Sequence, residues 1–217
     1  NPIKIGIGKL KARGARIVGV NPVRSGYNAV ADDWVGITPG TDGLFIMALI
    51  HELLNAGQID INYLTRYTNA GFLVNCGEAG PNKGLFLRDD NGKAQVIDRV
   101  TGKLSDYDAK GVQPKLTGHH RHAGETYRPA FELLAEQYMS KDYAPDAVAE
   151  RCGIPASRIK ALAADLARVA FEEEIVIDQP WTDWKGEKHA QMIGRPVSFH
   201  AMRGISAHSN GFQTCRA

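Results

Sequence analysis

Two short apolar runs, each followed by a polar turn, constrain the fold more than any other feature of the sequence. Residues 15–20 (Ala-Arg-Ile-Val-Gly-Val) lead into the polar segment 21–25, and residues 33–37 (Asp-Trp-Val-Gly-Ile) lead into the segment 38–42. The runs are too short for helices and are bounded by Pro and Gly, so we expect two buried strands. A long apolar helix is predicted over 43–56. In open α/β sheets, ligands bind at the carboxyl ends of strands, where both polar segments would lie.

The second turn, Pro39-Gly40-Thr41-Asp42, has the residues of a nucleotide site at the start of a helix. Gly40 permits a tight bend, Thr41 can cap the helix, and the free N–H groups of the first helical turn attract an anion such as a phosphate. Asp42 offers two acceptor oxygens, which fit the paired N–H donors at the edge of guanine. An ordinary strand-to-helix connection uses the same residues, so the turn alone leaves both interpretations open.

The remaining periodic segments predict further helices and one more strand. A helix is expected after a cap at Asp60, with Ile61, Leu64 and Tyr67 facing inward, and residues 174–178 (Glu-Ile-Val-Ile-Asp) predict another buried strand. Three helices are expected between them, at 128–139, 145–152 and 157–171. Helices that alternate with short apolar strands indicate an α/β fold with a mainly parallel sheet.

Residues from about 75 to 126 have a different character, because they are rich in Gly, Asp, Asn and Lys. We interpret them as an irregular surface insertion, with a hairpin over 84–98 around Asn91-Gly92. The run His119-His120-Arg121-His122 has no second ligand cluster nearby in the sequence. We therefore expect these histidines to be solvated, and we assign no metal site to the chain.

A second polar stretch follows the predicted strand at 174–178. Residues 179–184 leave that strand end, and residues 194–211 then supply Ser, Asn and Gly donors ahead of a last helix. Arg203 and His208 could hold a phosphate or an anionic substrate there. The alternative is an irregular surface loop whose tryptophans pack on the core.

The composition is that of a globular domain and excludes some classes of partner. The chain is 43% hydrophobic and 23% charged with a net charge of +2, a balance that requires neither nucleic acid nor a membrane surface. No apolar run approaches the ~20 residues needed to span a bilayer. The three cysteines lie far apart without CxxC spacing, which favours buried thiols over a disulfide or metal framework: Cys76, Cys152 and Cys215.

Several segments together resemble one family. They are Lys11-Ala-Arg-Gly-Ala-Arg-Ile-Val-Gly-Val-Asn-Pro22, Ala31-Asp-Asp-Trp34, Ile37-Thr-Pro-Gly-Thr-Asp42 and Gly204-Ile-Ser-Ala-His-Ser-Asn-Gly-Phe-Gln213. In this order they are similar to the molybdopterin oxidoreductases, the superfamily of dimethyl sulfoxide reductase, whose members bind molybdenum through two molybdopterin guanine dinucleotides. The resemblance covers nearly the whole chain but is weak between about 75 and 125. It implies one Rossmann-like, three-layer α/β domain over residues 1–217, cut from the large catalytic subunit. It also favours a helix for residues 3–13.

The resemblance assigns cofactor-binding residues position by position. Gly40, Thr41 and Asp42 would receive the guanosine end of the cofactor. Three residues would line the neighbouring strand end, and three more would lie along the cofactor towards the metal: Asn21, Pro22 and Ser25, then His208, Asn210 and Gly211. The sequence departs from the family pattern where Asn21 replaces the usual acid and Val23 replaces the usual arginine. No catalytic residue is assigned.

The implied function is that of a molybdenum or tungsten oxidoreductase, which acts on inorganic sulfur compounds or on formate. Its iron–sulfur cluster would lie in another part of the chain. Its partners would be the remaining domains of the same catalytic subunit, together with an iron–sulfur electron-transfer subunit. The isolated fragment is expected to be inactive, and its location can be cytoplasmic or periplasmic. Two other classes stay open. One is a simple nucleotide-binding Rossmann-like module that prefers NAD or a simple nucleotide, and the other is a non-catalytic assembly domain.

Overall fold

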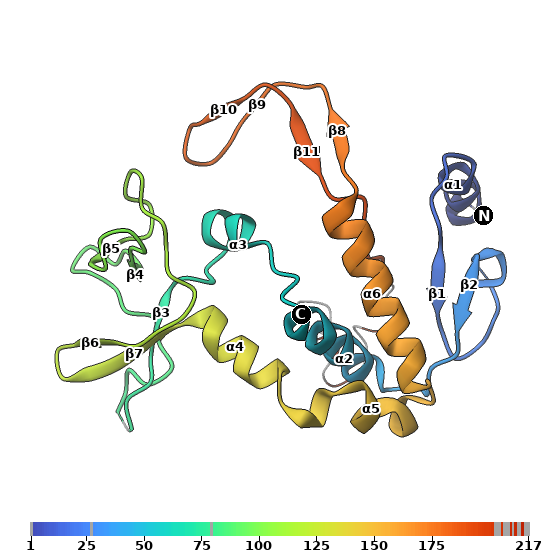
Figure 1. Ribbon diagram of the computed structural model, residues 1–217, viewed down its shortest axis with the longest axis horizontal. Coiled ribbons are helices and arrows are strands. Elements are labelled where there is room, and N and C mark those ends of the chain that lie inside the picture. Colours follow the sequence, from blue (N-terminus) through green and yellow to red (C-terminus); the bar gives the residue numbers. More distant parts are fainter. Residues whose placement is uncertain are drawn as a thin grey trace. The chain divides into compact units, whose positions relative to one another are not determined.

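The computed structural model describes residues 2–26, 28–78 and 80–201, together with residues 205, 209, 211 and 214 (Figure 1). The chain divides into two compact units that each combine non-contiguous segments. Unit 1 contains Asn1–Ala56, Ser140–Glu174 and Arg195–Ala217, and unit 2 contains Gly57–Met139 and Ile175–Gly194. In the described part of the chain, no helix is both long and apolar enough to cross a membrane.

Unit 1 is mainly helical and has one pair of strands. In chain order its elements are α1 (Pro2–Ala12), β1 (Val18–Val20), the 3₁₀ turn η1 (Asn28–Val30), β2 (Asp33–Val35), α2 (Asp42–Asn55), the 3₁₀ turn η2 (Lys141–Tyr143), α5 (Pro145–Cys152) and α6 (Ala156–Glu172). The helix α2 packs against α5 and α6. Eleven buried residues form the core between them: Val35, Ile37, Phe45, Ala48, Leu49, Val148, Cys152, Ile154, Ile159, Leu162 and Ala163.

The two strands of unit 1 run parallel. Val18 pairs with Asp33, and Val20 pairs with Val35, so the strands end side by side. Only the second strand is buried as predicted. Val35 is 4% exposed, whereas Val18 and Val20 are each 37% exposed, because only Gly19 of the first strand faces packed atoms.

Unit 2 is built from short antiparallel strands and two helices. Its elements are α3 (Ile61–Tyr67), β3 (Leu73–Asn75), β4 (Gln95–Ile97), β5 (Leu104–Asp106), β6 (His120–His122), β7 (Glu125–Pro129), α4 (Ala130–Tyr138), β8 (Ile175–Ile177), β9 (Trp181–Thr182), β10 (Lys188–His189) and β11 (Met192–Gly194). The strands pair in the order β3-β7-β6 and as β4–β5, β8–β11 and β9–β10. The core cluster is small and consists of Leu73, Ile97 and Tyr127, with Leu87 and Leu104 packed against it.

The mixed helix and strand content agrees with the sequence analysis, but the sheets are small. Among the described residues, β1–β2 is the only parallel pair of five sheets. The helices predicted with bounds between residues 3 and 171 are confirmed within one to two residues at each end, and α5 has the predicted bounds. The last predicted helix lies mostly outside the described residues. The hairpin at Asn91-Gly92 is also confirmed, because Arg88 bridges Ala94 and Gly92 has a φ of +80°.

Two further predictions about burial are wrong. The strand predicted at 174–178 is not buried: Ile175, Val176 and Ile177 are 47–54% exposed, because β8 pairs with β11 and neither face of this two-stranded ribbon is covered. The helix after Asp60 forms, and the Asp60 side chain accepts from the Tyr63 amide at 2.9 Å. However, Ile61 and Tyr67 are 58% and 39% exposed rather than inward.

Candidate functional site

The carboxyl ends of β1 and β2 bring six of the predicted cofactor residues to one edge of unit 1. Because Val20 lies opposite Val35 in a parallel pair, segment 21–25 and segment 36–42 both leave the strands at the same edge. The Asn21 amide extends the pairing by donating to the Val35 carbonyl at 3.1 Å. The strand-end arrangement expected from the sequence is therefore present.

Asn21 shapes the first of these two turns with its own side chain. Its Oδ1 accepts from the Val23 amide at 3.0 Å, and its carbonyl accepts from the Trp34 indole at 2.9 Å. The Asn21 side-chain oxygen is thus engaged in a local turn in which its NH₂ group takes no part. Pro22 and Ser25 follow on the exposed surface of the same turn.

Asn28 follows this turn and is bonded to it, because its amide donates to the Ser25 carbonyl at 3.1 Å. Its side chain is buried, and its Oδ1 has no hydrogen-bond partner among the described residues. That oxygen lies against Gly19, where an added Cβ would come within 2.4 Å of it. Close packing between η1 and β1 therefore requires glycine at position 19.

The second turn is fixed to α5 and is open towards solvent. The Thr38 amide donates to the Cys152 carbonyl at 2.9 Å, and this bond ties the turn to the end of α5. Gly40 has a φ of +83°, as a tight bend requires, and nothing lies within 4 Å of where its Cβ would be. The turn is therefore accessible to a ligand.

The predicted cap at Thr41 is wrong in its details. Thr41 is the N-cap residue of α2 but makes no side-chain capping bond, because its hydroxyl donates to the Thr38 carbonyl at 2.7 Å instead. The first-turn amides of α2 are consequently not satisfied by that hydroxyl and can serve an anion. Asp42, half-buried, stands in this first turn.

The candidate residues near the end of the chain are described less fully. Gly211 is buried and has helical backbone. His208, Asn210 and also Arg203 lie outside the described residues, so their predicted roles remain predictions.

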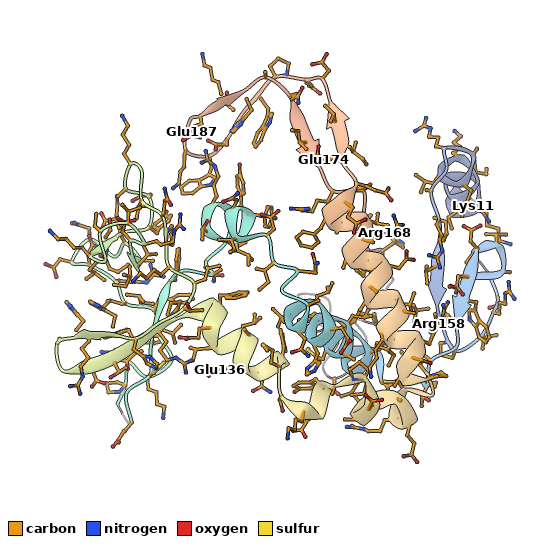
Figure 2. All side chains as sticks on the ribbon, viewed as in Figure 1. Lys11, Glu136, Arg158, Arg168, Glu174 and Glu187 are labelled. Carbon is orange, nitrogen blue, oxygen red and sulfur yellow. The ribbon has the colours of Figure 1, made fainter. Side chains whose placement is uncertain are left out.

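Ion pairs tie α6 to the β1–β2 edge of unit 1. Asp33 on β2 accepts from both Arg16 and Arg158, and Asp165 accepts from Arg16 and Arg168. Figure 2 shows Arg158 and Arg168 at different heights along α6. These side chains are partly exposed, so we assign them a positioning role for the strand pair rather than a large share of stability.

Sequence reasoning missed a polar cluster in unit 2 that joins α3 to the β9–β10 hairpin. The Asp183 side chain is fully buried, and its Oδ2 accepts from Arg66 Nε at 2.9 Å and from a second guanidinium nitrogen. Its Oδ1 accepts from the amides of Lys185 and Glu187, both at 2.9 Å. Burial by itself raises the pKa of Asp183, but the bonds from Arg66, the Glu187 amide and His189 lower that pKa to about 2.

The same cluster contains a set of possible metal ligands. Asp183, Glu187 and His189 each offer one ligand atom, and these atoms lie within 4.8 Å of one another. However, the Arg66 guanidinium bonds both carboxylates and already supplies the cation of the cluster. We therefore identify it as an ion-pair anchor. No local signal could have revealed it, because Arg66 and Asp183 are 117 residues apart in sequence.

Aromatic contacts complete this anchor. The Trp184 indole donates to the Arg66 carbonyl at 2.8 Å and stacks on Tyr107 with a 6.0 Å centroid distance. Trp181 stacks on His189 at 4.5 Å. Trp184 thus joins the hairpin to α3 and to Tyr107, whereas Trp181 packs within the hairpin. Trp184 is 49% exposed, so it does not pack on the core as the alternative supposed.

Comparison with known proteins identifies relatives that match most or all of the chain. No family model matches. The chain is 41% identical over 228 residues to a subunit of the sulfite dehydrogenase of Allochromatium vinosum, an alignment that covers 100% of this chain and 23% of that protein. It is 30% identical over 142 residues to the formate dehydrogenase-O major subunit of Escherichia coli, which covers 65% of this chain and 13% of the relative.

A third relative is the alpha chain of the perchlorate reductase of Dechloromonas aromatica, 24% identical over 199 residues, which covers 74% of this chain and 21% of the relative. In all three cases the chain spans less than a quarter of the relative's length. These relatives are oxidoreductase subunits, and each is several times longer than this chain. The chain belongs to the molybdopterin oxidoreductase family and is part of an oxidoreductase.

Proposed function

We propose that this chain is the part of a molybdenum or tungsten oxidoreductase catalytic subunit that binds the guanine dinucleotide end of the pterin cofactor. The observation that carries the proposal is the single edge of unit 1 at which segments 21–25 and 36–42 leave two parallel strands. Similarity along the full chain to a sulfite dehydrogenase subunit supports it.

The chemistry of the donors fits such a group. The amides of the first turn of α2 would receive a phosphate, and the absence of a Cβ at Gly40 leaves room for close approach. The Asp42 carboxylate would accept from the guanine edge, and the Asn21 NH₂ group would donate to a ribose hydroxyl or to a phosphate. His208, Asn210 and Gly211 would follow the cofactor towards the metal.

The cofactor itself supplies the oxygen-atom or hydride chemistry when it is bound, and this chain supplies binding and orientation. In the complete subunit we expect further strands to extend β1–β2 into a Rossmann-like parallel sheet. Residues of about 75–126 would then be an insertion on one α/β domain. The partners would be the other domains of the same subunit, together with an iron–sulfur electron-transfer subunit.

For the substrate, we propose an inorganic sulfur oxyanion such as sulfite. The support is the difference in similarity: 41% identity over the whole chain to a sulfite dehydrogenase subunit, against 30% over two thirds of it to a formate dehydrogenase subunit. The test is turnover by the full-length protein with sulfite and with formate. Activity with formate alone would overturn the sulfite assignment and leave the cofactor assignment standing.

The test of cofactor binding is the nucleotide released from the purified full-length protein, compared with its Asp42→Ala variant. We expect a guanine nucleotide from the wild type and roughly tenfold less from the variant, since one forked carboxylate contact is lost. Asp146→Ala is the matched control, because Asp146 also lies in a first helical turn of unit 1, on α5. Release of NAD or an adenine nucleotide would support the simple nucleotide-binding module instead. A protein without any bound nucleotide would support the assembly domain.

A further inference from the structure

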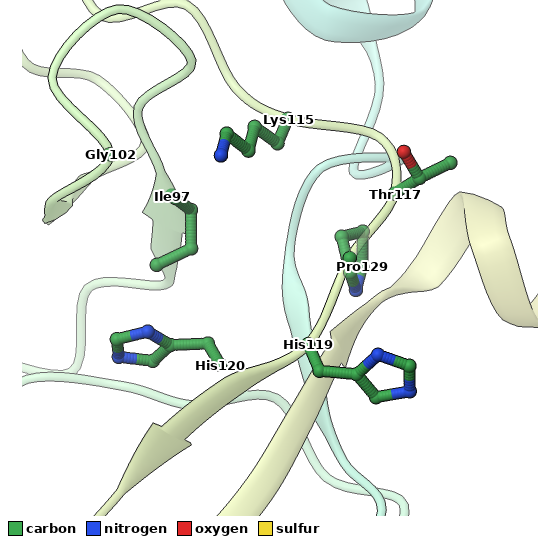
Figure 3. Close-up of a pocket in the computed structure, with 8 residues that line it drawn as sticks. Ile97, Gly102, Lys115, Thr117, His119, His120 and Pro129 are labelled. Carbon is green, nitrogen blue, oxygen red and sulfur yellow. The ribbon is translucent and has the colours of Figure 1, made fainter.

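A small pocket lies wholly within unit 2, and no residue assigned to the cofactor lines it. It has a volume of about 100 Å³ and opens between the end of β4, the segment before β6 and the end of β7 (Figure 3). Ile97 and Pro129 form its buried apolar side. Polar residues line the rest: Lys115, Thr117, His119 and His120.

Lys115 is held in place by its backbone. Its amide donates to the Ile97 carbonyl at 2.8 Å, and the preceding residue, Pro114, is buried and bridges Asp98. Figure 3 shows the lysine side chain extending over Ile97, on the side where the His120 ring also lies, whereas the His119 ring points the opposite way. The backbone of Lys115 is therefore fixed, and its side chain lies on the same side of the pocket as Ile97 and the partly buried His120.

The acids near the pocket are engaged with other donors. Asp98 accepts from the Thr101 hydroxyl at 2.7 Å and from the Thr101 and Gln113 amides at 3.0 and 3.1 Å. These bonds hold the pKa of Asp98 at about 2, so Asp98 is a carboxylate whose oxygens already accept hydrogen bonds from neighbouring residues.

The Glu132 carboxylate, on α4, also has hydrogen-bond donors of its own. It accepts from Arg128 Nε at 3.0 Å and from the Gly118 amide at 3.3 Å. Glu136 forms an ion pair with the same arginine. Within the described part of the chain, the Lys115 ammonium has no carboxylate partner.

The size of the pocket restricts what could neutralise this charge. A volume of about 100 Å³ suits a small ion better than a nucleotide or a peptide. A tetrahedral ion such as sulfate or phosphate has the right size. Its oxygens could accept from an ammonium and an imidazole N–H.

We propose that this pocket binds a free inorganic tetrahedral oxyanion, with Lys115 as its cation and His120 as a donor. The site is independent of the proposed cofactor function, because it uses no residue of unit 1. Its occupation would join β4, the segment before β6 and β7 through one ligand.

The experiment is equilibrium dialysis of the full-length protein with radiolabelled sulfate and, separately, phosphate, in a chloride-free buffer. We compare wild type with Lys115→Gln, and Lys110→Gln serves as the matched control because Lys110 is exposed and lines no part of the pocket. We expect Lys115→Gln to weaken one saturable site by about tenfold or more, equivalent to ~1.4 kcal/mol. The control should bind as wild type does.

Equal binding by wild type and Lys115→Gln would overturn the proposal, and so would an equal loss in Lys110→Gln, because that result indicates only a general charge effect. His120→Gln gives a second readout, with a smaller loss at the same site. A soak of full-length crystals with selenate locates the ion directly, and anomalous scattering elsewhere but not beside Lys115 would also contradict the site.

Discussion

The two units of the chain are stabilised in different ways. Unit 1 has one core of eleven buried apolar residues shared by α2, α5, α6 and β2. Unit 2 has a core of three buried residues, and its hairpins are joined by hydrogen-bonded acids such as Asp98 and Asp183. Because its apolar core stabilises unit 1, the turns at the ends of β1 and β2 can stay open to solvent. In unit 2, by contrast, charged side chains are used to stabilise the fold.

The largest expected effect tests the apolar core of unit 1. Ile159 on α6 is fully buried, so Ile159→Ala removes a packed side chain and leaves a cavity. We expect the free energy of unfolding of unit 1 to fall by about 3–4 kcal/mol, measured by hydrogen exchange of α2 and α6 in denaturant. The control, Val100→Ala, changes a side chain that is 71% exposed. Comparable losses in both variants would remove the distinction between the two units.

The second effect tests the polar anchor of unit 2. Arg66→Ala leaves the buried Asp183 carboxylate without its guanidinium partner. We expect the amides of residues 181–189 to exchange roughly 100-fold faster, because the hairpin then opens more easily. Arg88→Ala is the control, since Arg88 is bonded only to a backbone carbonyl of its own turn among the described residues. Unchanged exchange in Arg66→Ala would show that the aromatic contacts suffice.

A third, smaller effect concerns the support of the strand-end turn. In Gly19→Ala the new methyl group meets Asn28 Oδ1, and we expect a loss of about 2 kcal/mol from overpacking. The double variant Gly19→Ala/Asn28→Ala should recover part of that loss, because it removes the conflicting oxygen. Denaturant unfolding measures both. Absence of recovery would mean that the conflict lies with Ala31, the other neighbour, 3.2 Å from the added Cβ.

The smallest effect is a pH dependence restricted to unit 2. The pKa of Asp183 in the folded protein is about 2, below its ordinary value of 3.8, so the native state binds protons less readily than the unfolded state. Its stabilising contribution is therefore complete above pH ~4 and is lost as the pH falls towards 2. Tryptophan fluorescence should report release of Trp184 over this range, and Asp183→Asn should lack the transition. A transition that persists in Asp183→Asn would assign it to another acid, of which Asp98 has the same low pKa.

A feature could be predicted from the sequence when the residues that determine it lie close together along the chain. The bounds of α2, α5 and α6 were predictable because apolar periodicity, Pro145 and Gly153 act within one helix, and Gly153 has the expected left-handed φ of +68°. The turns at 21–25 and 38–42 were predictable for the same reason. The pairing of Arg66 with Asp183 was not, because nothing local marks an arginine as the partner of an acid 117 residues later.

The error over residues 174–178 has another origin. A run of Ile, Val and Ile predicts that a strand is buried, but it contains no information on which segment covers it. In the structure the strand pairs with β11 instead, and the apolar side chains face outward on both sides.

That exposed ribbon has a practical consequence for anyone who produces this chain by itself. Five large apolar side chains on β8 and β11 are between 41% and 56% exposed: Ile175, Val176, Ile177, Met192 and Ile193. Among the described strands, β8 and β11 pair only with each other, so each has one edge open to another strand. Such edges recruit strands from neighbouring molecules. The isolated chain should therefore precipitate as its concentration rises, and Val176→Lys, which places a charge in the middle of the ribbon, should raise its solubility limit.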